Sequence, residues 1–113
     1  MAGNVIYPND AFNARVESFM SGVNGRIAEH FRKNLSCLEA DIVSADPGNR
    51  YIKIVRTDAN GNGKSVFCFI DKSNGDVLKA AGWKAPAKHA RGNIFNPDNG
   101  MGAVSVWGAN YLK

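Results

Sequence analysis

Apolar residues recur at steps of three and four along the first third of the chain, and this spacing constrains the fold more than any other feature. Such spacing places the apolar side chains along one side of an α-helix. The sequence therefore predicts a single helix over residues 9–35, capped by Asn9 or Asp10. The predicted apolar stripe comprises Phe12, Val16, Phe19, Met20, Val23, Ile27, Phe31 and Leu35.

Two glycines, Gly22 and Gly25, lie in the middle of this predicted helix. A glycine inside a helix costs about 1 kcal/mol relative to alanine, so a structural reason for the pair is expected. Either the helix kinks there, or the small residues allow a close contact with a sheet or with a second copy of the helix. The last alternative predicts a homodimer through the long helix.

After Cys37 the apolar pattern changes to a period of two residues, which is typical of β-strands. Turn sequences rich in Gly, Asn and Asp separate the alternating runs. The most apolar run, residues 65–70, is expected in the middle of the sheet. Tyr111 and Leu112 are expected to fold back on the core. Strands are predicted over residues 38–45, 51–57, 65–70, 76–79 and 103–107.

A helix followed by consecutive strands predicts an α+β fold, with one long N-terminal helix packed on a four- or five-stranded antiparallel sheet. The strands form a meander over residues 37–107 that contains a basic loop at residues 79–96. A chain of 113 residues suits one such domain over residues 1–113. No run of about 18 apolar residues occurs, so no membrane span is expected.

Metal, cofactor and catalytic sites are not predicted. Residues 58–63 match the opening of a calcium-binding EF-hand loop, but Phe69 stands where the bidentate carboxylate is required. That segment is therefore interpreted as a hairpin turn. The cysteines Cys37 and Cys68 both follow strand-like patterns and are expected to be buried free thiols. His30 has no nucleophile or acid partner nearby in the sequence, and neither has the second histidine.

The basic loop at residues 79–96 is the main candidate for function. The chain carries a formal charge of +4, and this loop, with four cations and no acid, accounts for the excess. Its Gly and Pro content makes the loop entropically costly to order unless its side chains are used. The predicted ligand-binding residues are Lys79, Trp83, Lys84, Lys88, His89, Arg91, Asn93 and Phe95.

Cations that alternate with aromatic side chains can contact phosphates and stack on bases at the same time. The leading hypothesis is therefore non-catalytic binding of single-stranded nucleic acid or a nucleotide. An inhibitor or adaptor that binds a host protein is an alternative, and so is a small structural or assembly protein. The loop could also be structural, with Trp83 and Phe95 closing the edge of the core.

The segment over residues 69–95 resembles part of a group of small uncharacterised proteins of tailed bacteriophages. The shared features are Gly-Asp-Val-Leu-Lys-Ala-Ala after a turn, followed by Trp-Lys-Ala-Pro and Ala-Arg-Gly-Asn. Residues 108–112 are similar as well, and the resemblance covers about residues 50–113. It implies a phage-encoded protein that acts in the host bacterial cytoplasm, and it implies no particular activity.

Overall fold

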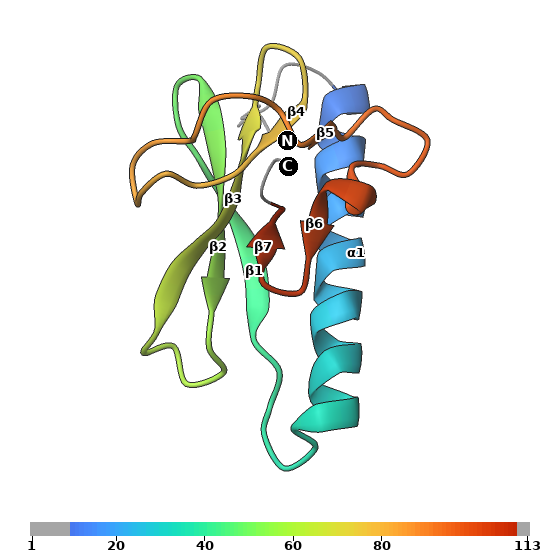
Figure 1. Ribbon diagram of the computed structural model, residues 1–113, viewed down its shortest axis with the longest axis vertical. Helices are drawn as coiled ribbons and strands as arrows, with labels where there is room; N and C mark the ends of the chain where they lie inside the picture. The colour runs from blue at the N-terminus through green and yellow to red at the C-terminus, as the bar shows by residue number, and fades with distance from the viewer. Residues whose placement is uncertain (1–9, 111–113) are drawn as a thin grey trace.

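One long helix lies beside a curled antiparallel sheet in the computed structural model, which describes residues 10–110 (Figure 1). The helix, α1, spans Asp10–Asn34. A 3-10 helix, η1 (Met101–Ala103), leads into a small second sheet made of β6 (Val104–Ser105) and β7 (Gly108–Ala109). The strands of the larger sheet are β1 (Ile42–Pro47), β2 (Tyr51–Thr57), β3 (Lys64–Asp71), β4 (Asp76–Leu78) and β5 (Gly92–Asn93).

The helix predicted from the apolar stripe is confirmed. Asn9, one of its two expected caps, lies outside the described residues, and Leu35 is exposed because α1 ends one residue earlier. Within residues 10–110, no helix is both long and apolar enough to cross a membrane. The stripe is buried at Phe12, Val16, Phe19, Val23, Ile27 and Phe31.

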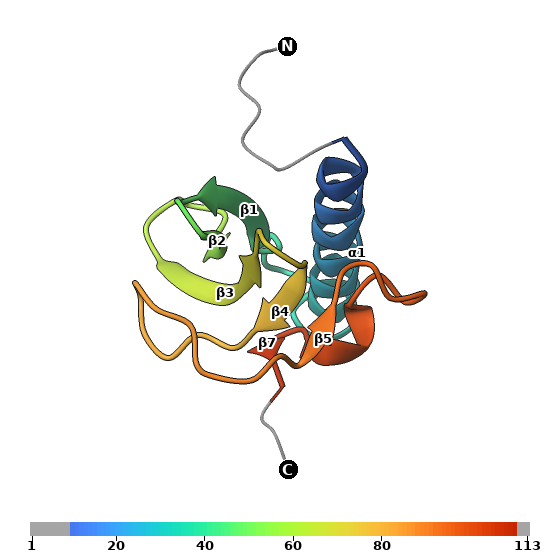
Figure 2. The ribbon, with the colours of Figure 1, turned by 90° about the horizontal axis from the view of Figure 1, so that it is seen from above.

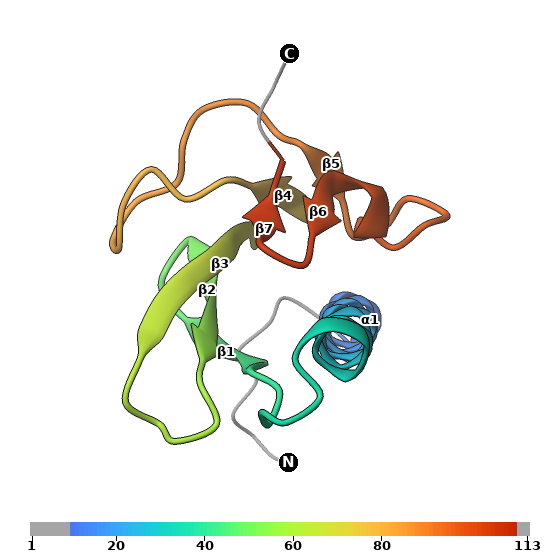
Figure 3. The same ribbon diagram turned by 60° about the horizontal axis from the view of Figure 1, so that its bottom comes forward.

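The larger sheet is a meander in which each strand pairs with the next along the chain, in the order β1-β2-β3-β4-β5 and always antiparallel. The α+β fold and the central position of β3 are therefore confirmed. A register shift between Ile54 and Val55 interrupts the β2–β3 ladder, and such bulges increase the local twist. The sheet curls so that its concave face surrounds α1 (Figures 2 and 3).

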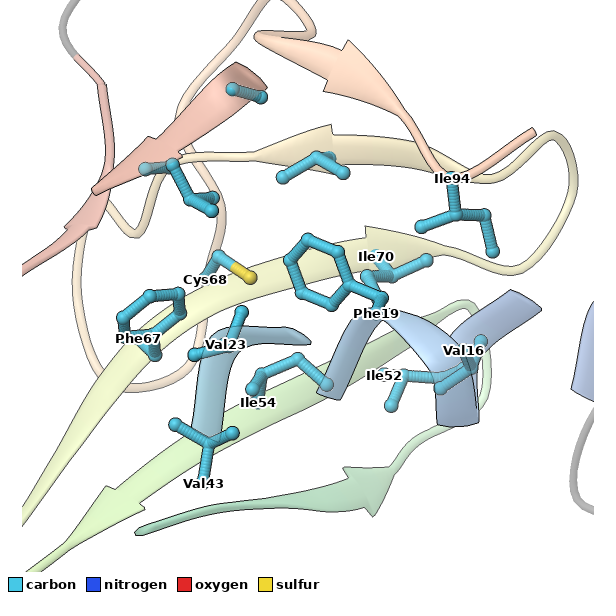
Figure 4. Packing of buried hydrophobic residues seen from close by; sticks show 14 of the residues in the cluster. Val16, Phe19, Val23, Val43, Ile52, Ile54, Phe67, Cys68, Ile70 and Ile94 are labelled. Carbon is cyan, nitrogen blue, oxygen red and sulfur yellow. The ribbon is translucent and has the colours of Figure 1, made fainter. Parts of the chain in front are cut away.

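The core fills this concave face. Ile52 and Ile54 of β2 point towards α1, where they meet Phe19 and Val23 (Figure 4). Ile70 of β3 lies beside them, and all five side chains are fully buried. Each such side chain contributes about 1.5–3 kcal/mol relative to an exposed one, so this contact supplies much of the stability.

Polar side chains of α1 attach both edges of the sheet to the helix. At one edge, Val43 of β1 donates its backbone N–H to Asn24 Oδ1 at 2.8 Å, and Asn24 Nδ2 donates to the Val43 carbonyl at 3.4 Å. At the other edge, Arg15 Nε donates to the carbonyl of Ile94 at 2.7 Å, directly after β5. The helix is thus held across the whole width of the sheet.

The two glycines of α1 have different environments. A Cβ at Gly22 would lie 3.0 Å from the Met101 side chain, so this glycine allows η1 to approach the helix closely. A Cβ at Gly25 would meet nothing within 4 Å. Gly22 therefore lies at a close contact as predicted, but its partner is Met101 of η1, neither a sheet nor a second copy of α1. A homodimer through this face stays a prediction.

The prediction for residues 37–45 was wrong in two respects. The strand predicted over residues 38–45 begins only at Ile42, whose side chain is 56% exposed, and the neighbouring Val43 is buried against α1. Cys37 is an exposed free thiol, because residues 35–41 connect the helix to the sheet and form no strand. Cys68 is a buried free thiol as expected. In this segment both alternating sets contain apolar residues, so periodicity alone could not assign the inward face.

The single strand predicted at residues 103–107 was also wrong. Val104–Ser105 pairs with Gly108–Ala109, and the intervening residues Val106 and Trp107 form a tight turn. Gly108 has φ +135°, a conformation that glycine adopts readily. Trp107 therefore lies at the tip of a hairpin, where it is 70% exposed. Tyr111 and Leu112, expected to fold back on the core, lie outside the described residues.

Replacing Phe19 by alanine should lower the free energy of unfolding by about 3–5 kcal/mol, because the ring is fully buried between α1 and the sheet. Urea denaturation measures this loss. The neighbouring exposed residue supplies a control, since Ser18→Ala should change stability by less than about 0.5 kcal/mol. Equally small losses in both variants would contradict the described packing of α1.

Candidate functional site

The basic loop has more regular structure than the sequence predicted. Its first part is a short hairpin over residues 79–87, the outer hairpin, closed by a bridge between Ala80 and Pro86. The Ala87 N–H donates to the Lys79 carbonyl at 2.7 Å within this hairpin. The later residues Gly92–Asn93 form β5 and pair with Asp76–Val77. The loop is therefore a hairpin and an edge strand joined by a short connection.

The outer hairpin lies on the side of the sheet away from α1 (Figures 2 and 3). This face contains Phe69, which pairs across the strands with Lys53 on one side and Leu78 on the other. Phe69 and Leu78 are buried, although neither belongs to the core cluster around α1. They form a second, smaller apolar layer on the outer face.

Trp83 connects the outer hairpin to the sheet. The ammonium nitrogen of Lys53 lies 4.1 Å from the centre of the Trp83 ring, a favourable cation–π contact. The Trp83 side chain is nevertheless 47% exposed. An indole held in place but still accessible can stack on a ligand without losing much conformational freedom.

A hollow of about 240 Å³ opens beside this contact. Its walls are the end of β1 and the turn that follows it, residues 46–49, together with Arg50, Tyr51, Lys53, Phe69 and Lys84. We call it the cationic hollow. Three cations, Arg50, Lys53 and Lys84, line it with a single acid, Asp46. This imbalance favours an anionic ligand.

Arg50 is fixed at the edge of the cationic hollow by two contacts. Its guanidinium lies 5.2 Å from the centre of the Tyr51 ring, and its Nη2 is 3.3 Å from Asp71 Oδ2. Burial raises the pKa of Asp71, but hydrogen bonds from the Ser73 hydroxyl and backbone N–H, together with Arg50, bring the pKa below its ordinary value overall. Asp71 is therefore a carboxylate at neutral pH and holds Arg50 in position.

A second hollow adjoins the cationic hollow, and the two share Arg50 and Tyr51. Its lining includes Asp76, Asn74, Leu78 and Pro86, and we call it the adjoining hollow. The predicted residues Lys88 and His89 lie on its rim. Neither side chain makes a hydrogen bond or ion pair with any described residue. Both stay candidates for ligand contact.

Four of the predicted residues are engaged elsewhere in the fold. Arg91 donates to the carbonyls of Lys88, His89 and Asn110, so its guanidinium organises the loop. The ammonium of Lys79 lies 3.5 Å from the carbonyl of Ala109 in β7. Both cations therefore stabilise the connection between the loop and the rest of the chain.

The other two engaged residues are Asn93 and Phe95. Asn93 Nδ2 donates to the Asn74 carbonyl at 2.8 Å and to Asp76 Oδ1 at 3.0 Å. The Phe95 ring makes an edge contact with Phe12 of α1, with 5.7 Å between the ring centres. Phe95 is therefore on the helix side of the sheet, away from the cationic hollow.

The structure thus brings Trp83 and Lys84 together with three residues that the sequence analysis missed, Arg50, Tyr51 and Lys53. The alternation of β2 carried part of the missing signal. Lys53 and Tyr51 alternate with buried isoleucines, so they had to lie on the face away from the helix. Which segment covers that face depends on the path of the loop, and periodicity does not give it.

The calcium-like segment at residues 58–63 is a hairpin turn, as predicted. The Asp58 carboxylate accepts the backbone N–H groups of Asn62 and Gly63, each at 3.0 Å. Strands flank the turn on both sides, where an EF-hand requires helices. Within residues 10–110, no group of three His, Cys, Asp or Glu side chains is arranged to hold a metal ion.

Residues 10–112 match the sequence profile of a family of unknown function, DUF7717. The chain belongs to the DUF7717 family. No curated protein and no solved structure matches the chain. Membership of DUF7717 assigns no activity, so a function has to be inferred from the site itself.

Replacing Arg91 by alanine should lower the free energy of unfolding by about 1–2 kcal/mol, because three carbonyls lose a charged hydrogen-bond donor. Lys88→Ala removes the same charge from the same loop but no hydrogen bond with a described residue. Its expected effect is below about 0.5 kcal/mol. Chemical denaturation of both variants tests the difference, and equal effects would contradict the structural role of Arg91.

Asp71 should make folding stability depend on pH. Its folded-state pKa lies below the ordinary value, so the folded state favours the carboxylate more strongly than the unfolded state does. This contribution is present above the unfolded-state pKa of about 3.9 and is lost as the pH falls through the folded-state pKa. The stability difference between the wild type and Asp71→Asn should therefore shrink on acidification. A difference that does not vary with pH would contradict this assignment.

Proposed function

We propose that this protein binds a nucleotide unit, free or within single-stranded nucleic acid, through the cationic hollow. One observation carries the proposal. Arg50, Lys53 and Lys84 come from a turn, a strand and the outer hairpin, and they gather around one hollow beside the accessible ring of Trp83. The binding is proposed to be non-catalytic.

Electrostatics supports a phosphate at this position. The Lys84 ammonium has no hydrogen bond or ion pair with any described residue, so its charge is available to a ligand. Lys53 contacts an uncharged ring and forms no ion pair with a described residue. Charge-assisted hydrogen bonds from such groups to phosphate oxygens are stronger than those between neutral partners.

Aromatic side chains support a base beside the phosphate. Tyr51 is partly exposed and lines the cationic hollow, and the half-exposed ring of Trp83 contacts Lys53, another lining residue. Stacking of a base on an aromatic ring contributes about 1–3 kcal/mol. A ligand that combines a phosphate with a base would use both kinds of group at once.

The size of the hollow agrees with partial coverage of the ligand. Pockets that enclose small molecules usually measure about 300–1,000 Å³, whereas the cationic hollow measures about 240 Å³. A nucleotide here would keep part of its surface exposed, as a unit of a longer strand must. The resemblance to phage proteins adds the proposal that this binding takes place in the host bacterial cytoplasm.

A second candidate function is binding to a host protein. Trp107, Leu35 and Leu38 are exposed near the C-terminal end of α1, where the Trp107 ring lies 5.1 Å from the ring of His30. Clusters of exposed apolar side chains often mark protein interfaces. This surface is separate from the cationic hollow.

Lys84→Ala should weaken binding of a fluorescently labelled single-stranded oligonucleotide, measured by anisotropy. It should also reduce the slope of log K against log salt by about 0.7, because one phosphate contact is lost. Trp83→Ala should weaken binding with little change in that slope, since stacking releases no counterions. The matched control is Lys64→Ala, an exposed lysine outside the cationic hollow.

Lys64→Ala should leave both the affinity and the salt slope close to those of the wild type. Equal weakening by Lys64→Ala and Lys84→Ala would show diffuse charge attraction and contradict a defined site. If no oligonucleotide or nucleotide binds but a host protein does, the second candidate function replaces the first.

A further inference from the structure

The adjoining hollow differs in chemistry from the cationic hollow next to it. Its floor includes the apolar residues Leu78, Pro86 and Ala87, which suit the flat face of a base. Two carboxylates, Asp71 and Asp76, also line it. A ligand that extends from one hollow to the other across Tyr51 therefore meets cations at one end and, at the other, two carboxylates together with Lys88 and His89.

The two carboxylates are not equally available. Asp71 accepts hydrogen bonds on both oxygens, from Ser73 on Oδ1 and from Arg50 on Oδ2. Asp76 accepts from Asn93 on Oδ1 only, at 3.0 Å. Its Oδ2 has no hydrogen-bond partner among the described residues. Asp76 is thus the carboxylate that can accept a donor from a ligand.

The position of Asp76 is also fixed before any ligand arrives. Its backbone N–H donates to Asn74 Oδ1 at 2.9 Å, and Asn93 links its carboxylate to the Asn74 carbonyl. Asp76 belongs to β4, which pairs with β3 on one side and β5 on the other. A carboxylate held in this way loses little conformational freedom when a ligand binds.

We infer that the nucleotide unit bound here carries a guanine base, with its phosphate in the cationic hollow and its donor edge on Asp76 in the adjoining hollow. This inference rests on the proposed function and adds the identity of the base. Guanine presents two N–H donors side by side, at N1 and at the 2-amino group. Adenine and cytosine present one amino group beside an acceptor nitrogen, and uracil presents a single N–H between two carbonyls. A carboxylate accepts only, so guanine matches it best.

The first test compares guanosine 5′-monophosphate, inosine 5′-monophosphate and uridine 5′-monophosphate by isothermal titration calorimetry on the wild-type protein. Inosine differs from guanosine only in lacking the 2-amino group. Loss of one hydrogen bond to a charged acceptor should weaken binding about tenfold. The uridine nucleotide should bind more weakly still. Equal affinities for all three would overturn the inference and leave the proposed function in place.

The second test uses Asp76→Asn, which keeps a carbonyl oxygen for Asn93 but replaces the free carboxylate oxygen by an amide. The ratio of the affinities for the guanosine and inosine nucleotides should fall to about one. Lys84→Ala should weaken all three nucleotides by the same factor and preserve the preference. An unchanged preference in a folded Asp76→Asn protein, with folding checked by thermal denaturation, would overturn the assignment of Asp76.

Oligonucleotides distinguish a free nucleotide from a strand as the source of the guanine. Guanine-containing and guanine-free single strands of equal length are titrated beside the mononucleotides. Tighter binding of the guanine-containing strand than of the mononucleotide supports a strand, and the reverse supports a free nucleotide. In either case the guanine preference stands. Failure of every nucleotide and strand to bind would overturn the proposed function together with this inference.

Discussion

The contact between the apolar stripe of α1 and the concave face of the sheet is the interaction on which the rest of the structure depends. Phe19 and the isoleucines of β2 leave one face of the sheet fully covered. Asn24 and Arg15 then fasten the helix to the two edges of the sheet. Ile94, Ala103, Val104 and Ala109 complete the core on this concave face. The outer hairpin, residues 79–87, lies instead on the opposite face.

The outer face has a much smaller cover, and this incomplete cover creates the candidate site. The outer hairpin buries Phe69 and Leu78 but leaves Tyr51 and Lys53 half-buried beside it. A larger element there would have closed the hollows. The ring of Trp83 is exposed in the same arrangement, although it contacts Lys53 of β2. The site is therefore a result of how unequally the two faces of one sheet are covered.

The sequence was sufficient for the helix, for the meander and for the position of β3, because each rests on a long, regular apolar pattern. It was insufficient where two adjacent strand residues are both apolar, as Ile42 and Val43 are at the start of β1, because either one could face the core. For the site, residue type identified Trp83 and Lys84. It could not show that Arg91 would donate hydrogen bonds to three backbone carbonyls. Those carbonyls belong to Lys88, His89 and Asn110, and their positions depend on the course of the loop.

The edge strand β1 has a consequence for how copies of the chain can associate. Backbone groups on the outer side of an antiparallel edge belong to every second residue, here Val43, Ala45 and Pro47. The backbone N–H and carbonyl of Val43 are already hydrogen-bonded to the Asn24 side chain, and Pro47 has no N–H to donate. Of these three residues, only Ala45 has both a backbone N–H and a carbonyl available for hydrogen bonds to another strand. One such residue is too few for a second strand to pair. Growth of the sheet from one molecule into the next is therefore blocked along β1, and assembly at this edge would have to use side chains.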